Sequence, residues 1–287
     1  MYSSCLRPVA LALLAGLLTP AAAFAAAPGP LRVCADPDNL PFSNDRLEGF
    51  ENKIARLLAD DLHTTLEYTW YSQQHRGFLR ATLLAGKCDV VIGVPQGYGA
   101  VLSTNPYYRS SYVFVSRRSS SVRPHSFDDP TLRSLRIGLY AYGAEGGNAP
   151  PVYALSRRGL SRNLVGYSIL ATEQSPAGKI FQAVAEGDVD VAIVWGPLVG
   201  GFLRQKAGEL VATAVETSDE QPPLQFAFDI SMGVRRDDGE RVQQLNEVLR
   251  RRSGDIRQVL MANDIPILDQ EATVAVAPLA ATTTVKH

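Results

Sequence analysis

The sequence has few of the residues that most often build catalytic or metal centres. It holds three cysteines and four histidines in 287 residues, and the histidines do not have the spacing of metal ligands. It has no G-x-S-x-G motif of a serine hydrolase and no loop with the spacing of an EF-hand. These absences give little support to catalysis or to a resident metal ion.

Long apolar runs are missing beyond the first part of the chain. Residues 9–18 form an apolar run too short to span a bilayer, and the small residues at 21–27 include an Ala-Phe-Ala cleavage pattern. We predict that residues 1–25 are a signal peptide that directs export to the periplasm. Without Arg7 the chain carries 27 basic and 29 acidic residues, a net charge of −2. No basic face dominates, which argues against nucleic acid as a partner. No apolar run of spanning length remains, which argues against a membrane-embedded protein.

Export leaves an even pair of cysteines in an oxidising compartment. Cys34 lies in a short apolar strand and Cys88 opens another, CDVVIGV. These strands could be neighbours in one sheet, which predicts a Cys34–Cys88 disulfide. The alternative is two small, buried apolar side chains.

Residues 31–44, LRVCADPDNLPFSN, combine a buried strand with a loop rich in proline and aspartate. Residues 49–62 follow with Phe50, Ile54 and Leu58 at helical spacing, so the loop lies between a strand and a helix. Ligands of open α/β sheets bind at such strand ends. This loop is the first candidate for a functional surface.

The same order of elements occurs twice. Three strands with a helix between each consecutive pair are predicted in each half. The strands are at 31–35, 64–70 and 88–94, and again at 135–140, 164–170 and 189–195, and the helices are at 49–62, 74–85, 150–159 and 177–186. The segments GKCDVVIG from Gly86 and GDVDVAIV from Gly187 mark the repeat. Two lobes with parallel sheets are therefore expected.

Two helices end the chain, at 238–251 and 255–263, without a sheet of their own. Placing them on the first half makes the chain cross between lobes twice, with a ligand cleft between the lobes. We expect residues 28–117 and 222–268 to form lobe 1, 118–221 to form lobe 2 with the hinge segments, and 269–287 to be a loose tail. We expect a monomer.

Several segments carry a more specific resemblance, namely CADPDNLPFSN, EGFENKIA, EYTWYSQQHRGFLRATL, CDVVIGVPQGY, TNPYYRSSYVFV and DVAIVWGPLVG. Over residues 31–268 the chain resembles the solute-binding protein family 3, with the type II periplasmic binding fold. Within it, the chain is similar to the quinoprotein dehydrogenase-associated binding proteins of the MxaJ and XoxJ type.

The resemblance implies a periplasmic accessory factor for a dehydrogenase that uses pyrroloquinoline quinone (PQQ) to oxidise methanol or another alcohol. The family is thought to help make or activate that enzyme and not to perform the oxidation. The resemblance therefore implies the dehydrogenase, with its cytochrome c, as partner, and no cofactor of the chain's own.

The chain departs from amino-acid receptors of this family at two positions. The receptors' carboxylate-binding arginine falls on Gly97, and their amine-binding aspartate falls on Trp195. A buried amino acid whose charges are unpaired would cost several kcal/mol. A small apolar or peptide ligand is expected instead.

Six of the thirteen candidate cleft residues are aromatic, and aromatic side chains are typical of peptide interfaces. The candidates are Asp36, Asn39, Phe42, Arg76, Pro95, Gln96, Tyr98, Tyr107, Arg109, Tyr140, Tyr142, Glu145 and Trp195. The alternatives are ordinary core packing for the aromatic residues, salt bridges for the two arginines, and a plain turn for Glu145.

Three acidic pairs, Asp36 and Asp38, Asp128 and Asp129, and Asp237 and Asp238, are explained by turns and helix caps better than by a metal site. Two other functions stay open. One is a receptor that delivers a small solute to an ABC transporter. The other is an enzyme on the same fold, for which Glu145 or Glu173 would supply the acid or base.

Overall fold

A computed structural model of the chain describes residues 29–73, 77–141, 149–168, 176–205, 208–216 and 224–268. The strands are β1 Leu31–Ala35, β2 Asp38–Asn39, β3 Ser43–Asn44, β4 Leu66–Trp70, β5 Val90–Pro95, β6 Leu102–Ser103, β7 Tyr108–Arg117, β8 Ile137–Ala141, β9 Leu164–Ser168, β10 Val191–Trp195, β11 Leu210–Ala214 and β12 Ala227–Val234. The helices are α1 Phe50–Asp61, α2 Phe78–Ala81, α3 Pro150–Arg157, α4 Pro176–Glu186, α5 Gly200–Gln205, α6 Gly239–Arg251 and α7 Ser253–Ala262, with 3₁₀ turns η1 Pro130–Ser134, η2 Ser161–Asn163 and η3 Gly196–Val199.

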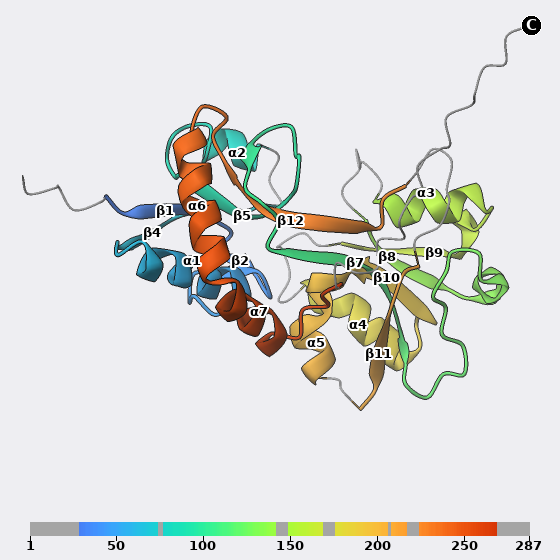
Figure 1. Cartoon of the computed structure of the whole chain (residues 1–287). Helices are drawn as coiled ribbons and strands as arrows, with labels where there is room; N and C mark the ends of the chain where they lie inside the picture. Colours follow the sequence, from blue (N-terminus) through green and yellow to red (C-terminus); the bar gives the residue numbers. More distant parts are fainter. Residues whose placement is uncertain are drawn as a thin grey trace, which may run out of the picture.

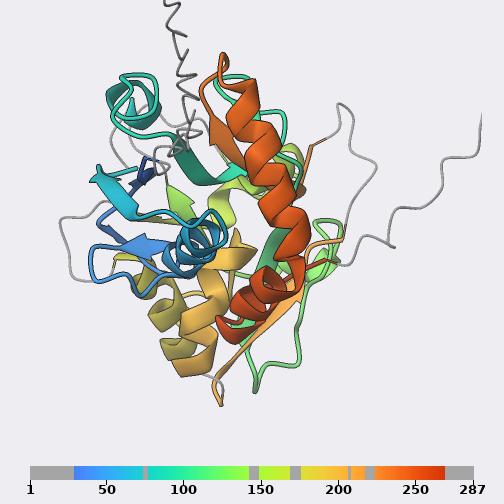
Figure 2. The same ribbon diagram turned by 60° about the vertical axis from the view of Figure 1, so that its left-hand side comes forward.

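The first lobe is built on strands in the order β4-β1-β5-β12, of which β4, β1 and β5 are parallel and β12 runs antiparallel to β5. Buried side chains of these strands share one apolar cluster with α1, α6 and α7. Figures 1 and 2 both show α6 and α7 beside α1, although they are far apart in the sequence. The last two helices therefore pack against the first half of the chain.

The second lobe has the strand order β10-β8-β9, all parallel, and β7 lies antiparallel to both β10 and β11. Ile180, Phe181 and Val184 of α4 are fully buried against these strands. A second cluster, around Phe114 and Phe127, covers the other face together with α3. The predicted repeat of strand, helix and strand is therefore present in both lobes.

Two long strands connect the lobes. Residues 108–111 of β7 pair with β12, and residues 112–117 of the same strand pair with β10 and β11 of the second lobe. Figure 1 shows β7 and β12 running side by side from one lobe to the other. The chain passes between lobes within a continuous strand, while the predicted lobe limits at 117 and 222 stay predictions.

The segment after α7 runs along the hinge strand β7 and reaches the second lobe. The Ser110 hydroxyl donates to the Pro266 carbonyl at 2.6 Å, and the Leu268 amide donates to the Arg109 carbonyl at 2.9 Å. A side chain on Gly200 of α5 would strike the Asn263 carbonyl. Glycine at position 200 therefore lets the end of α7 lie directly on the second lobe.

One predicted helix is wrong in its extent. Residues 74–85 were expected to be helical, but among the described residues the helix covers only Phe78–Ala81. Residues 74–76 lie outside the described residues, and the helix ends because the backbone of Thr82, with φ −120° and ψ −85°, leaves the helical region. The predicted signal peptide and the tail at 269–287 lie outside the described residues, and no described helix has the length and apolarity to cross a membrane.

The predicted disulfide is confirmed. Cys34 of β1 and Cys88 just before β5 are bonded, with 5.5 Å between their Cα atoms. The parallel pairing of β1 with β5 brings them together, and both are buried with Leu83, Val91 and Val101. The bond closes a loop that contains α1 and β4.

We expect the double substitution Cys34→Ala and Cys88→Ala to lower the free energy of unfolding by about 4 kcal/mol, since the bond restricts a loop of 54 residues in the unfolded chain. Denaturant unfolding measures the change. The unsubstituted protein unfolded in reductant is the control and should lose a similar amount. A loss below about 1 kcal/mol would show that the bond adds little.

Candidate functional site

The loop from β1 to α1 is folded back onto the start of the helix. The amides of Phe50 and Glu51 donate to the carbonyls of Pro41 and Phe42, each at 2.9 Å. A side chain on Gly49 would collide with the Phe42 carbonyl, so this close approach requires glycine. These contacts hold Phe42 against Phe50, with ring centroids 5.3 Å apart.

Asp36 is buried and shapes this loop. Its carboxylate oxygens accept hydrogen bonds from the amides of Asp38 at 3.0 Å and Gln73 at 2.6 Å. Asn39, at the exposed end of the loop, donates from its side chain to Gln73 at 3.1 Å. Both predicted site residues therefore make contacts that fix the loop.

Trp195 lies at the end of β10 in an aromatic cluster that joins three strands. Its ring is 5.5 Å from Tyr112 of β7 and 5.7 Å from Phe228 of β12, both in edge-to-face contact. Tyr112, Trp195 and Phe228 are called the hinge aromatic cluster below. Trp195 was predicted from the sequence, whereas Tyr112 and Phe228 were not, because only the pairing of β7 with β10 and β12 brings the three side chains together.

Phe42 and Trp195 are half-buried side chains that each pack against the apolar clusters of both lobes. Phe42 reaches the second lobe from the first-lobe loop, whereas Trp195 reaches the first lobe from the end of β10. These two predicted site residues therefore lie at the contact between the lobes. We call this contact, together with the hinge aromatic cluster, the interlobe surface.

The hinge also carries an ion pair. Arg109 of β7 and Asp229 of β12 are opposite each other in the strand register, and the guanidinium Nη1 lies 2.9 Å from the Asp229 carboxylate. For Arg109 the alternative of an internal salt bridge is thus present in the structure. A pair this exposed adds little to stability but fixes the register of the two strands.

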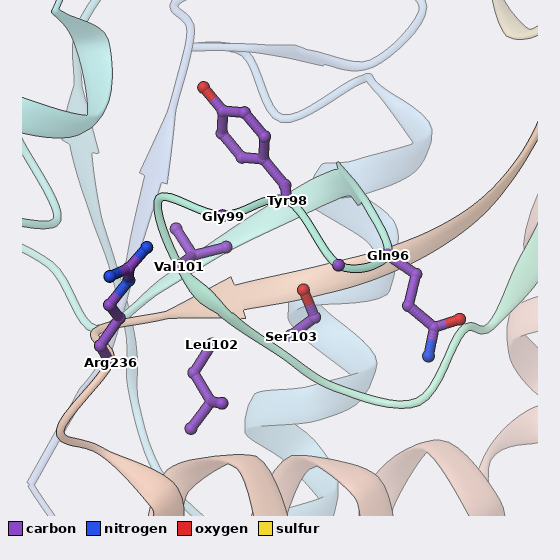
Figure 3. A pocket seen from close by; sticks show the side chains of 8 residues that line it. Gln96, Tyr98, Gly99, Val101, Leu102, Ser103 and Arg236 are labelled. Atoms are coloured by element: carbon purple, nitrogen blue, oxygen red, sulfur yellow. The ribbon is translucent and has the colours of Figure 1, made fainter. Parts of the chain in front are cut away.

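Gln96 and Tyr98 lie around a different hollow, on the loop between β5 and β6 (Figure 3). Its volume is about 560 Å³, and Arg236, just after β12, completes its wall. The sequence analysis missed Arg236, which the pairing of β6 with β12 brings to this loop.

The other predicted residues are dispersed. Pro95 is exposed at the end of β5, and Tyr140 is buried in the core of the second lobe. Tyr107 lines a small hollow of about 250 Å³ against α6 and α7. Arg76, Tyr142, Glu145 and Glu173 lie outside the described residues. The proposed site as a whole stays a prediction.

Glu51 is a buried acid that the sequence analysis did not select. Its side chain is on the apolar face of α1, one and two turns before Ile54 and Leu58, so the helical period contained the signal. Only 7 % of the residue is exposed, and burial raises the pKa of its carboxyl to about 8. The carboxyl lies against Gly93, where a side chain would collide with Oε1.

Gly93 is the unpaired residue of a bulge in β5 opposite β12, with φ +82°. Tyr107 and Tyr108 lie near the same carboxyl, and burial raises the pKa of both phenols well above the usual range. The Tyr107 hydroxyl has no hydrogen-bond partner among the described atoms. A protonated carboxyl, two neutral phenols and a strand bulge therefore lie together beside the hinge strands.

The acidic pairs act as turns and caps. Asp129 caps η1 by accepting from the Thr131 amide at 2.9 Å, and Asp238 caps α6 by accepting from the Arg241 amide at 3.1 Å. Within the described part of the chain, no group of three or more histidine, cysteine or acidic residues is placed to hold a metal ion.

Comparison with known proteins places this geometry in a family. The profile of the bacterial extracellular solute-binding proteins, family 3, matches residues 31–259. The chain belongs to this family. Membership implies a periplasmic location and agrees with the type II periplasmic binding fold, which the two sheets and the double strand crossing display.

The chain is similar to protein MoxJ of Methylorubrum extorquens, with 30% identity over 267 residues, which are 87% of this chain and 86% of that protein. Its structure is similar to MxaJ from Methlophaga aminisulfidivorans, with a TM-score of 0.74 and 26% identity over 83% of this chain and 100% of that one. It is also similar to the periplasmic binding protein XoxJ from Methylobacterium extorquens, with a TM-score of 0.67 and 37% identity over 84% and 100% of the two chains. The resemblance read from the sequence motifs is confirmed.

We expect stability to fall as pH rises because of Glu51. Between pH 4.5, the ordinary carboxyl pKa, and about 8, the native carboxyl keeps its proton while the unfolded one has lost it. Raising the pH therefore favours the unfolded state, by about 1.4 kcal/mol per pH unit from this group. Denaturant unfolding at several pH values measures the slope.

Glu51→Gln should flatten this slope. Glu240→Gln is the matched control, because Glu240 is an exposed acid in the first turn of α6. Equal slopes in the two variants would contradict the assignment to Glu51.

Proposed function

We propose that the protein is a non-catalytic periplasmic accessory factor of a PQQ-dependent alcohol dehydrogenase, usually a methanol dehydrogenase, and that it holds a segment of that enzyme at the interlobe surface. The similarity to MoxJ, MxaJ and XoxJ supports the association with methanol oxidation. The character of the interlobe surface supports a polypeptide as the ligand.

The position of Trp195 carries the proposal. An amino-acid receptor of this family would have an aspartate there, and this chain has an indole packed between Tyr112 and Phe228. Gly97, at the position of the receptor's arginine, has no side chain to offer a charge. Arg109 and Asp229, the charged groups beside the cluster, neutralise each other at 2.9 Å. Among the described residues of this surface the two charges are thus already paired, which favours apolar side chains over a zwitterion as the ligand.

The contacts of Phe42 indicate how such a segment would bind. Phe42 already packs against the apolar clusters of both lobes, so this surface accepts apolar groups in the structure itself. In our proposal, side chains of the dehydrogenase replace part of these contacts and shift the balance between lobe arrangements about β7 and β12.

We expect the protein to bind the quinoprotein dehydrogenase of its own organism, measured by titration calorimetry with the apo and the holo enzyme. Preference for the apo enzyme would support a role in assembly. Phe42→Ala should weaken binding at least tenfold, or about 1.4 kcal/mol, since buried aromatic anchors dominate such interfaces.

Tyr153→Ala is the control, because Tyr153 is 49% exposed on α3 of the second lobe and makes no part of the interlobe surface. The proposal fails if neither enzyme form binds, or if the two variants bind alike. Tight binding of a co-purified small solute would instead favour a transport receptor.

A further inference from the structure

The hollow on the loop between β5 and β6 is lined by residues that are not part of the interlobe surface. It is formed by residues 96–103 and by Arg236, and its volume of about 560 Å³ falls in the range of ligand sites. The loop is fastened to β12 at both ends. The Gln96 amide donates to the Asp229 carbonyl at 2.8 Å, and Leu102 and Ser103 pair with Val234 and Gly233.

Arg236 supplies an unpaired positive charge to this hollow. The neighbouring Arg235 is 3.5 Å from Asp89 and 3.4 Å from Asp238, so these nearby carboxylates already have a cation. Arg236 is exposed, and within the described residues its side chain makes no hydrogen bond or ion pair. Its guanidinium lies over Gly99, 3.9 Å from where a side chain would begin, so the glycine leaves it uncovered.

A second polar group lies in the same wall. The Ser103 hydroxyl oxygen is buried without a hydrogen-bond partner among the described atoms. In Figure 3 it points into the ring that the loop makes, with Arg236 and Gln96 on opposite sides of it. A buried hydroxyl without a partner is unfavourable, so this wall holds an uncompensated polar group close beneath the hollow.

Apolar side chains flank these donors. Tyr98 is 48% exposed and Leu102 36% exposed, and they extend from the loop in Figure 3 on either side of Val101 and Ser103. Val101 rests on Gly233, whose absent side chain would be only 2.9 Å from it, which keeps the loop in place. The hollow thus combines a guanidinium and a hydroxyl with exposed apolar surface.

We propose that this hollow binds an acidic side chain of a protein partner, a carboxylate with apolar residues beside it. A guanidinium binds a carboxylate with two parallel hydrogen bonds, and Arg236 would supply both here. An exposed ion pair is weak alone because water screens it, so a free carboxylate would bind poorly. Apolar neighbours on a peptide would add contact with Tyr98 and Leu102, and tyrosine and arginine are typical anchors of protein interfaces.

The test titrates 15N-labelled protein with a capped tripeptide that has glutamate between two leucines, and follows the backbone amides by NMR. We expect shifts confined to residues 96–103 and 236. The same tripeptide with glutamine should bind at least tenfold more weakly, and so should the glutamate peptide with the Arg236→Gln variant.

Arg162→Gln is the matched control, because Arg162 is an exposed arginine of the second lobe. Unchanged binding in this variant and loss in Arg236→Gln support the proposal. It is overturned if the loop amides do not respond at millimolar peptide, if the glutamine peptide binds equally, or if sodium acetate alone gives the same response at the same concentration. The dehydrogenase titration has no part in this outcome, so either proposal can fail alone.

Discussion

The pairing of β7 with β12 is the constraint on which the rest of the structure depends. These two strands complete the first sheet, and β7 continues into the second, so one hydrogen-bonded ladder fixes both lobes. The hinge aromatic cluster exists because this ladder places Tyr112 and Phe228 on either side of Trp195. The charge balance of Arg109 with Asp229 follows from the same register. The strands that place these side chains thus cross from one lobe to the other.

The buried carboxyl of Glu51 belongs to the same region. It occupies space that the Gly93 bulge leaves open, and the bulge lies where β5 meets β12. An apolar residue would fill such a position at lower cost, because burial penalises the charged form. The family fold is therefore retained here with an ionisable group close to the strands that cross between the lobes.

Local patterns explain why much of the fold was predictable. Apolar alternation and helical spacing identify β1, α1 and β5, and these strands, as neighbours, predict the disulfide. The failures have physical reasons. The non-helical backbone of Thr82 ended α2 early, and Arg236 lies near the loop of Tyr98 only because the distant strands β6 and β12 pair. The helical period of α1 places the acid Glu51 on its apolar face, so the sequence pattern does contain the signal for a buried carboxyl.

The place of β12 has a consequence for biogenesis. This strand is inserted between β5 and β7, although the chain reaches it only after the whole second lobe. While an exported chain emerges from its N-terminus, the edge of β5 stays without its neighbour, and an open strand edge invites pairing with other chains. The covalent loop between the first and third parallel strands can close early, because both cysteines precede the second lobe. Strands β1 and β5 of the first sheet can thus be linked covalently before β12 has been exported.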